Sequence, residues 1–243
     1  FPGTNCEDES ALQFRRVGAE TVSPVFRWQS IEKAEQSISE LAEAIRGSQI
    51  LMIPGGFSAG DEPDGAAKYI AAVLRSAGIR EAVEELLVER DGLVLGICNG
   101  FQALVRTGLL PWGEYRDSTP ESPALADNRI GRHVSRYVMT AAQASDSPWL
   151  LETEPGEVYS VPVSHGEGRF SAGPDLVNRL IENGQVAFRY CDDAGMPSMR
   201  YPENPNGSAA AIEGITSPDG RILGKMGHSE RIGPGVAINI PGR

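Results

Sequence analysis

The chain has 243 residues, of which 40% are hydrophobic, and a formal net charge of −11. This length suits one large domain or two small ones, and the hydrophobic content is sufficient for a core. The acidic excess argues against nucleic acids and anionic membrane surfaces as main partners. No apolar run approaches the ~18 residues of a membrane span. Three cysteines without metal-ligand spacing indicate a reducing, cytoplasmic location and no metal site.

The first half of the sequence alternates predicted helices and apolar strands. Asn5 is a candidate cap for a first helix that Gly18 would end. Apolar residues at helical spacing predict further helices at 30–46, 64–76, 80–89 and 99–107. Short strands are predicted at 21–26, 49–53 and 93–97. This alternation implies an α/β fold with a parallel sheet covered by helices on both faces.

The second half is less regular. Strands are predicted at 135–140, 158–163 and 185–190, and a helix at 174–183. Near the end, segments 208–216 and 221–226 flank the turn sequence SPDG, which predicts a β-hairpin. Residues 111–131 are rich in proline and charge and are interpreted as a surface excursion. No internal repeat or convincing linker divides the chain, so we expect one domain over residues 1–243.

The stretch LVLGICNGFQ places Cys98 between a predicted strand and a predicted helix, with Gly96 and Gly100 around it. This is the cysteine version of the nucleophile elbow, in which glycines allow a strained turn. The helix N-terminus favours a thiolate, and the backbone N–H of Asn99 could face an oxyanion. The alternative is a core cysteine beside a tight turn, since short elbow patterns also occur by chance.

A reactive thiol requires a base, and the chain offers three histidines. His228 follows a predicted strand, and Glu230 could orient its imidazole, although His-x-Glu alone is also typical of a surface loop. His165 lies in VPVSHGEGRF, either as an ordinary loop residue or in a loop that approaches a ligand. His133 stands among arginines and is interpreted as part of a solvated basic face.

The loop PGGFSAGDE follows a predicted strand but lacks the Lys-Ser/Thr ending of a phosphate-binding loop. We therefore expect its backbone N–H groups, from Gly55, Gly56 or Phe57, to complete an oxyanion hole with Asn99. The two other cysteines lie in no comparable motif and are interpreted as structural; they are Cys6 and Cys191.

Taken in order, GGFS, GICNGFQ, SHGEGR and GHSER resemble the class I, or triad, glutamine amidotransferase domains of phosphoribosylformylglycinamidine (FGAM) synthases. PGTNCEDESA at the start and NPNGS before the final hairpin extend the resemblance along essentially the whole chain. It implies a flavodoxin-like three-layer sandwich with a mostly parallel central sheet. GDEPDG and KMGHSER look most like the C-terminal domain of the long single-chain bacterial form. We therefore expect a chain that is part of a larger polypeptide.

The resemblance implies a role for each matched residue. Cys98 would be the nucleophile, His228 the general base and acid, and Glu230 its orienting carboxylate. Gly56 and Asn99 would form the oxyanion hole. Residues expected to hold the substrate L-glutamine are Gly55, Phe57, Gln102, Ser164, His165 and Gly166. Many relatives have His-Pro-Glu in the last motif, whereas here Ser229 replaces the proline.

The resemblance also implies an activity: hydrolysis of glutamine through a Cys98 thioester, with the ammonia passed to a synthetase that makes FGAM in purine synthesis. No cofactor is expected in this chain, because Mg-ATP would bind in the synthetase region. The alternatives are a related cysteine hydrolase on the same fold, such as a γ-glutamyl hydrolase or a peptidase, and a catalytically silent interaction domain.

Overall fold

A computed structural model describes residues 1–57 and 67–240. Among these residues, seven strands form one sheet in the order β1-β2-β9-β8-β7-β4-β5. One part of the sheet is parallel and consists of β1 (Ile50–Ile53), β2 (Leu93–Ile97) and β9 (Ile222–Lys225). The remaining strands pair antiparallel; they are β8 (Ile212–Thr216), β7 (Val186–Tyr190), β4 (Val134–Ala142) and β5 (Val158–His165).

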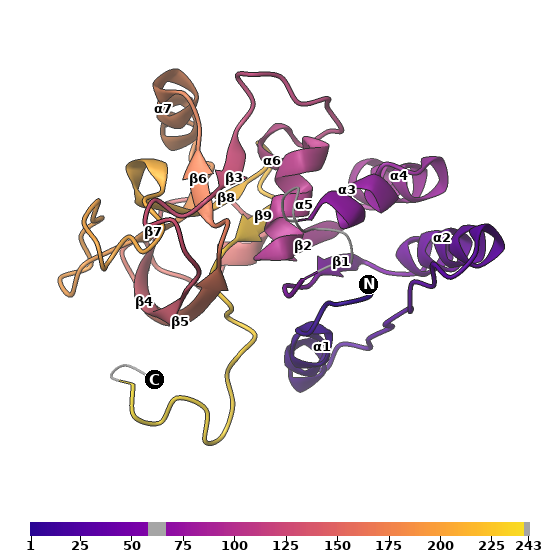
Figure 1. The fold of residues 1–243 in the computed structure, drawn as a ribbon, viewed down its shortest axis with the longest axis horizontal. Helices are drawn as coiled ribbons and strands as arrows, with labels where there is room; N and C mark the ends of the chain where they lie inside the picture. Colours follow the sequence, from indigo (N-terminus) through magenta and orange to yellow (C-terminus); the bar gives the residue numbers. More distant parts are fainter. Residues whose placement is uncertain (58–66, 241–243) are drawn as a thin grey trace.

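Helices cover both faces of the parallel half (Figure 1). Helix α5 (Asn99–Thr107) packs on β1, β2 and β9 from one side. Helix α1 (Glu7–Arg16) lies on the other side, where Phe14 and Val17 line a cavity of about 250 Å³ with Met52 and Leu95. The expected α/β sandwich is thus confirmed, and its sheet is mixed, because the second half of the chain adds antiparallel strands.

The remaining helices extend the fold at its periphery (Figure 1). Helix α2 (Ile31–Arg46) packs against α4 (Ala77–Glu84), which continues into a π-helical turn at Glu85–Glu89. Helix α3 (Lys68–Leu74) contacts α5. The others are α6 (Leu109–Trp112), α7 (Pro174–Glu182) and two 3-10 turns, Pro148–Leu150 and Ala209–Ala211. None of the helices in the described residues combines the length and apolar composition that a bilayer crossing requires.

Several predicted elements agree closely with the structure. The strand at 93–97 and the helix at 99–107 have the expected bounds, and β8 and β9 form the predicted hairpin around SPDG. The other predicted strands and helices are found with shifted ends, apart from one strand. The helix expected at 64–76 is observed as α3. The start of the predicted range cannot be compared, because residues 58–66 lie outside the described residues.

Three local predictions are wrong. Residues 21–26 form no strand, because no neighbouring segment in the described residues supplies ladder partners; Phe26 is nevertheless buried and stacks on Phe1. The residue at the cap of α1 is Cys6, not Asn5. The excursion at 111–131 contains an unpredicted strand, β3 (Ala124–Ala126), which pairs with β6 (Arg169–Ser171).

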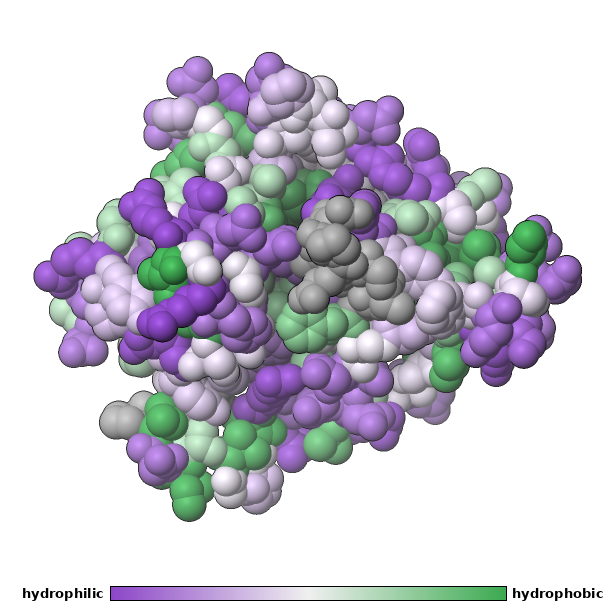
Figure 2. Space-filling view, viewed as in Figure 1, coloured by the Kyte–Doolittle hydropathy of each residue, from purple (hydrophilic) through white to green (hydrophobic). Residues whose placement is uncertain are grey.

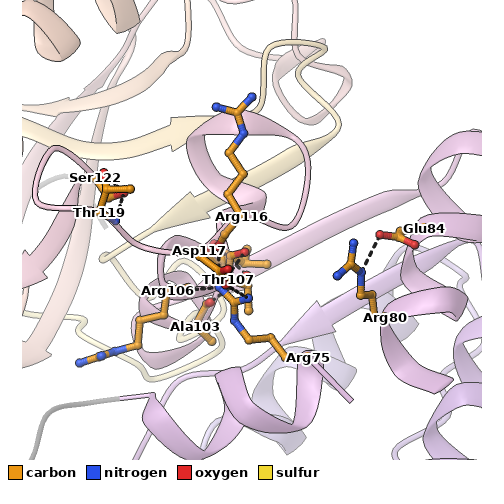
Figure 3. A network of polar contacts seen from close by, with 11 residues as sticks. Arg75, Arg80, Glu84, Ala103, Arg106, Thr107, Arg116, Asp117, Thr119 and Ser122 are labelled. Carbon is orange, nitrogen blue, oxygen red and sulfur yellow. Dashed lines mark hydrogen bonds and ion pairs between the residues drawn. The ribbon is translucent and has the colours of Figure 1, made fainter. Parts of the chain in front are cut away.

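The carboxyl end of α5 is anchored by Arg75, at the end of α3 (Figure 3). Its guanidinium donates to the carbonyl oxygens of Arg106, Thr107 and Arg116 and pairs with Asp117 at 3.1 Å. These contacts satisfy carbonyl groups that a helix end leaves without intrahelical partners. The helix that carries the predicted nucleophile at its start is therefore held at its other end as well.

The surface seen in Figure 2 is mostly hydrophilic, in keeping with the net charge of −11. Exposed apolar side chains gather on the C-terminal segment at the lower left, and they are Ile232, Val236 and Ile238.

Candidate active site

Cys98 occupies a strained turn between β2 and α5. Its backbone has φ +52° and ψ −105°, a left-handed conformation that non-glycine residues adopt rarely and mainly where function requires it. The turn is held by the Cys98 N–H, which donates to the carbonyl oxygen of Lys225 at 2.8 Å. A side chain at Gly100 would overlap the carbonyl oxygen of Ile53, so glycine lets α5 begin directly against β1.

His228 and Glu230 lie in the loop after β9, and both are buried. The His228 N–H donates to the carbonyl oxygen of Pro162 at 2.9 Å, and its Nδ1 lies 2.5 Å from Glu230 Oε1. A methyl group on Gly55 would lie 2.6 Å from His228 Cε1 and 3.2 Å from Cys98 Cβ. The imidazole and the thiol are therefore neighbours over Gly55, and the structure brings these three side chains together.

The electrostatics of this group favour a protonated imidazole. Burial by itself lowers the pKa of His228, but hydrogen bonds to Cys6, Cys98 and Glu230 raise that pKa to about 12. The positive imidazolium and the N-terminus of α5 both lie beside the Cys98 sulfur. The arrangement can therefore supply a nucleophilic sulfur and a proton donor.

The segment from Ser164 to Gly168 forms a wall beside the sulfur. Cys98 Sγ lies 3.8 Å from the Ser164 carbonyl oxygen, and Gln102 donates its side-chain amide to the Glu167 carbonyl oxygen. Gln102 is thus placed to support this wall. The Ser164 hydroxyl lies 3.0 Å from His133 Nε2, which puts the exposed His133 at the rim.

His165 is buried and held by Asn128. The Asn128 amide donates to the His165 carbonyl oxygen at 2.8 Å, and its Oδ1 lies 3.1 Å from His165 Nδ1. Burial lowers the pKa of His165 to about 3, so the ring is neutral and its Nδ1–H donates to Asn128. Its Nε2 then carries a lone pair, with no hydrogen-bond partner among the described residues.

The loop after β1 lies across the start of α5. Asn99 donates its side-chain amide to the Gly56 carbonyl oxygen at 2.7 Å, which ties the two expected oxyanion-hole residues together. Phe57 is exposed, and its ring lies 6.5 Å from that of His133. Ser58 and the rest of that motif, including GDEPDG, lie outside the described residues.

Sequence reasoning misses two groups around the site. The sequence pattern indicates a structural role for Cys6, but its Sγ lies 3.8 Å from His228 Nδ1. The available signal for Cys6 is its place in PGTNC, one of the stretches that carry the family resemblance. Asn128 stands in no motif, and nothing in the sequence predicts its contact with His165.

The donor atoms of Cys6, His228 and Glu230 lie within 4.8 Å of one another and could in principle hold a metal ion. The 2.5 Å contact between Nδ1 and the carboxylate is shorter than two ligands of one ion normally allow. The Arg231 guanidinium, 3.1 Å from Cys6 Sγ, adds a positive charge at the same place. These residues fit a hydrogen-bonded group better than a cation site.

Comparison with known proteins agrees with this geometry. Residues 1–243 match the family described as the CobB/CobQ-like glutamine amidotransferase domain. The chain belongs to the glutamine amidotransferase family. Its relatives include the FGAM synthase subunit PurQ of Symbiobacterium thermophilum, 37% identical over 100% of this chain and 90% of the relative. PurQ of Rubrobacter xylanophilus is 36% identical over 99% and 92%, respectively.

Among solved structures, this amidotransferase resembles that of PurLQS from Thermotoga maritima. The TM-score is 0.66 at 26% identity, over 95% of this chain and 85% of that chain. The likeness extends over nearly the whole chain, so the two proteins share the sandwich architecture.

Proposed function

We propose that this amidotransferase hydrolyses the side-chain amide of L-glutamine through a thioester on Cys98 and supplies the ammonia to the synthetase of FGAM synthase. The observation that carries the proposal is the buried group at the strand–helix turn: Cys98 beside His228, with Nδ1 of that histidine 2.5 Å from Glu230. The names of the relatives, FGAM synthase subunits, support the assignment of the ammonia acceptor.

The first half of the reaction forms the thioester. The Cys98 thiolate attacks the carboxamide carbon, and the carbonyl oxygen becomes an oxyanion. Backbone N–H groups of Gly56 and Asn99 would stabilise that charge, each contributing roughly 3 to 4 kcal/mol as in comparable sites. The imidazolium of His228 then gives its proton to the leaving nitrogen, and ammonia departs.

The second half releases glutamate. Neutral His228 takes a proton from water, and the resulting hydroxide attacks the thioester carbon. The C–S bond breaks, the thiolate returns to Cys98, and the imidazolium is restored. Glu230 keeps the imidazole in one tautomer and stabilises its positive form throughout, which is the role of the carboxylate in such triads.

The substrate would lie between two walls. Gly55 and Phe57 form one, and Ser164, His165 and Gly166 form the other. Gln102 supports the second wall through its hydrogen bond to the Glu167 carbonyl oxygen. The neutral Nε2 of His165 can accept a hydrogen bond, from the substrate amide or from the ammonia that it releases.

The wider organisation is part of the same proposal. Residues 1–243 act as one glutaminase domain in the cytoplasm, and the synthetase activates its formyl amide substrate with Mg-ATP bound outside these residues. The motifs GDEPDG and KMGHSER favour a C-terminal place in a single-chain synthase. Reading the coding sequence upstream of Phe1 tests this placement, and a stop codon directly before the domain would reject it.

The decisive experiment replaces Cys98 by Ala in the complete synthase. Glutamine-dependent synthesis should be lost, while synthesis with added ammonium continues. Glutaminase turnover that survives in Cys98→Ala would refute the assignment. A cysteine peptidase is distinguished by a glutamine analogue that alkylates Cys98, since a peptidase should largely ignore it.

A further inference from the structure

Cys6 lies beside the catalytic histidine and has no part in the cycle above. It is fully buried at the start of α1, and its Sγ lies 3.8 Å from His228 Nδ1, the nitrogen that also meets Glu230. Two further groups hold the sulfur: Arg231 donates from Nη2 at 3.1 Å, and Asn5 Oδ1 accepts at 3.1 Å. Cys6 therefore links the first helix to the catalytic loop.

Helix α1 also forms hydrogen bonds to the loop that carries His228. Gln13, two turns along α1, donates to the carbonyl oxygens of Glu230 at 2.8 Å and Ile232 at 3.2 Å. The Ser10 hydroxyl donates to the Cys6 carbonyl oxygen at 2.6 Å and fixes the turn that presents the sulfur. Because helix and loop are tied at Glu230, Arg231 and Ile232, directly after His228, the Cys6 sulfur has a defined position relative to the imidazole.

The segment before α1 also reaches the opposite wall of the site. Thr4 forms an isolated antiparallel bridge with Gly56. A methyl group on Gly56 would lie 2.6 Å from the Asn5 backbone nitrogen and 2.7 Å from Asn5 Oδ1. Residues 4–6 thus contact both the expected oxyanion loop and the histidine loop, two parts that must keep a fixed separation during catalysis.

We propose that Cys6 is a positioning residue of the glutaminase, which together with Arg231 holds the Nδ1 edge of the His228 imidazole and so keeps the ring in place beside Cys98. The hydrogen bond to Glu230 fixes the direction of Nδ1, and the buried Cys6 sulfur, 3.8 Å from the same atom, limits how far that edge of the ring can shift. This inference rests on the proposed function.

The ionisable groups that face His228 come from several elements. Cys6 comes from the start of α1, Cys98 from the turn before α5, and Glu230 and Arg231 from the loop of His228 itself. Burial and then the charges of His133 and His228 lower the pKa of His165, at the end of β5. Loss of Cys6 should therefore alter the pH dependence of catalysis as well as its rate.

The test compares Cys6→Ala and Cys6→Ser in the complete synthase, with Cys191→Ser as the control at a buried thiol outside the site. Cys6→Ala should lower glutaminase kcat by between about 10- and 100-fold, the range expected for a misplaced catalytic group. KM for glutamine should change little. Cys6→Ser keeps a polar atom at the position and should recover most of the loss, and Cys191→Ser should match the parent.

A spectroscopic readout separates positioning from a general structural role. The Nδ1 proton of His228, in its short hydrogen bond to Glu230, should give a downfield imidazole N–H signal in NMR spectra. Cys6→Ala should shift or broaden that signal and move the acid limb of the kcat profile, and Cys191→Ser should do neither. A parent-like kcat, pH profile and imidazole signal in Cys6→Ala would overturn the proposal.

Arg231→Gln provides a second route if Cys6→Ala does not fold. It should reduce kcat in the same direction, and the double variant with Cys6→Val, which removes the polar atom, should lose less than the product of the two single losses, because both act through one contact. If the two losses of kcat simply multiply in the double variant, Cys6 and Arg231 act independently and the proposal that they work together is wrong. The Cys98→Ala variant tests the function separately. Turnover in that variant would refute the proposed function itself. An inactive Cys98→Ala variant, with parent-like Cys6 and Arg231 variants, would refute this inference alone.

Discussion

His228 Nδ1 lies 2.5 Å from Glu230 Oε1, although one residue, Ser229, separates them in the chain. In an extended chain, side chains two positions apart point to the same side but start about 6.6 Å apart, so the loop must bend to bring these two into contact. The bend is held by backbone hydrogen bonds from Ser229 to Gly227 at 3.1 Å and from Arg231 to His228 at 3.2 Å. A proline at position 229 is therefore not required for this geometry.

Glu230→Gln tests the value of that contact. The amide can accept the Nδ1 proton but carries no charge, and it can also present its NH₂ group and select the wrong tautomer of His228. We expect glutaminase kcat to fall by up to about 10⁴-fold, as in a comparable triad. Glu89→Gln, at an exposed glutamate, should leave kcat unchanged. A loss below tenfold would show that Glu230 does not orient the base.

Gly55→Ala tests the closeness of thiol and imidazole. The added methyl would lie 2.6 Å from His228 Cε1, so the ring must move and catalysis should suffer. We expect kcat/KM to drop by on the order of 100-fold, the penalty for displacement of about 1 Å. The matched control is Gly78→Ala in α4, where the nearest atom would be 4.0 Å away. Similar kinetics for both variants would contradict the geometry.

His165 should make stability depend on acidity. Burial lowers its pKa from 6.5 to about 3, so in mild acid the unfolded chain binds a proton that the folded protein does not. Stability should thus be complete above about pH 6.5 and decrease as the pH falls toward 3, by about 1.4 kcal/mol per unit. In urea unfolding across this range, the free energy of unfolding should change less steeply with pH for His165→Gln than for the parent. Equal slopes for the parent and His165→Gln would contradict this prediction.

Local patterns are sufficient for much of the fold. The strand at 93–97 and the helix at 99–107 are predicted with their observed bounds, because an apolar run, a glycine-flanked turn and a helical apolar pattern follow one another directly. The segment 21–26 has a strand-like composition but forms none, because a strand exists only through its partners. The pairing of β3 with β6 joins residues more than 40 positions apart, and no local sequence pattern predicts it.

The order of residues along the chain is enough to predict the chemistry that this protein performs. It contains a cysteine in a glycine-flanked turn, a histidine and a glutamate in one loop, and a succession of motifs that points to one family. Which groups act on one another became visible only in three dimensions. Cys6 meets His228 across 222 positions of chain, and Asn128 holds His165 across 37. Such contacts depend on how helices and loops pack around the sheet, and packing depends on the whole chain, not on the residues beside each group.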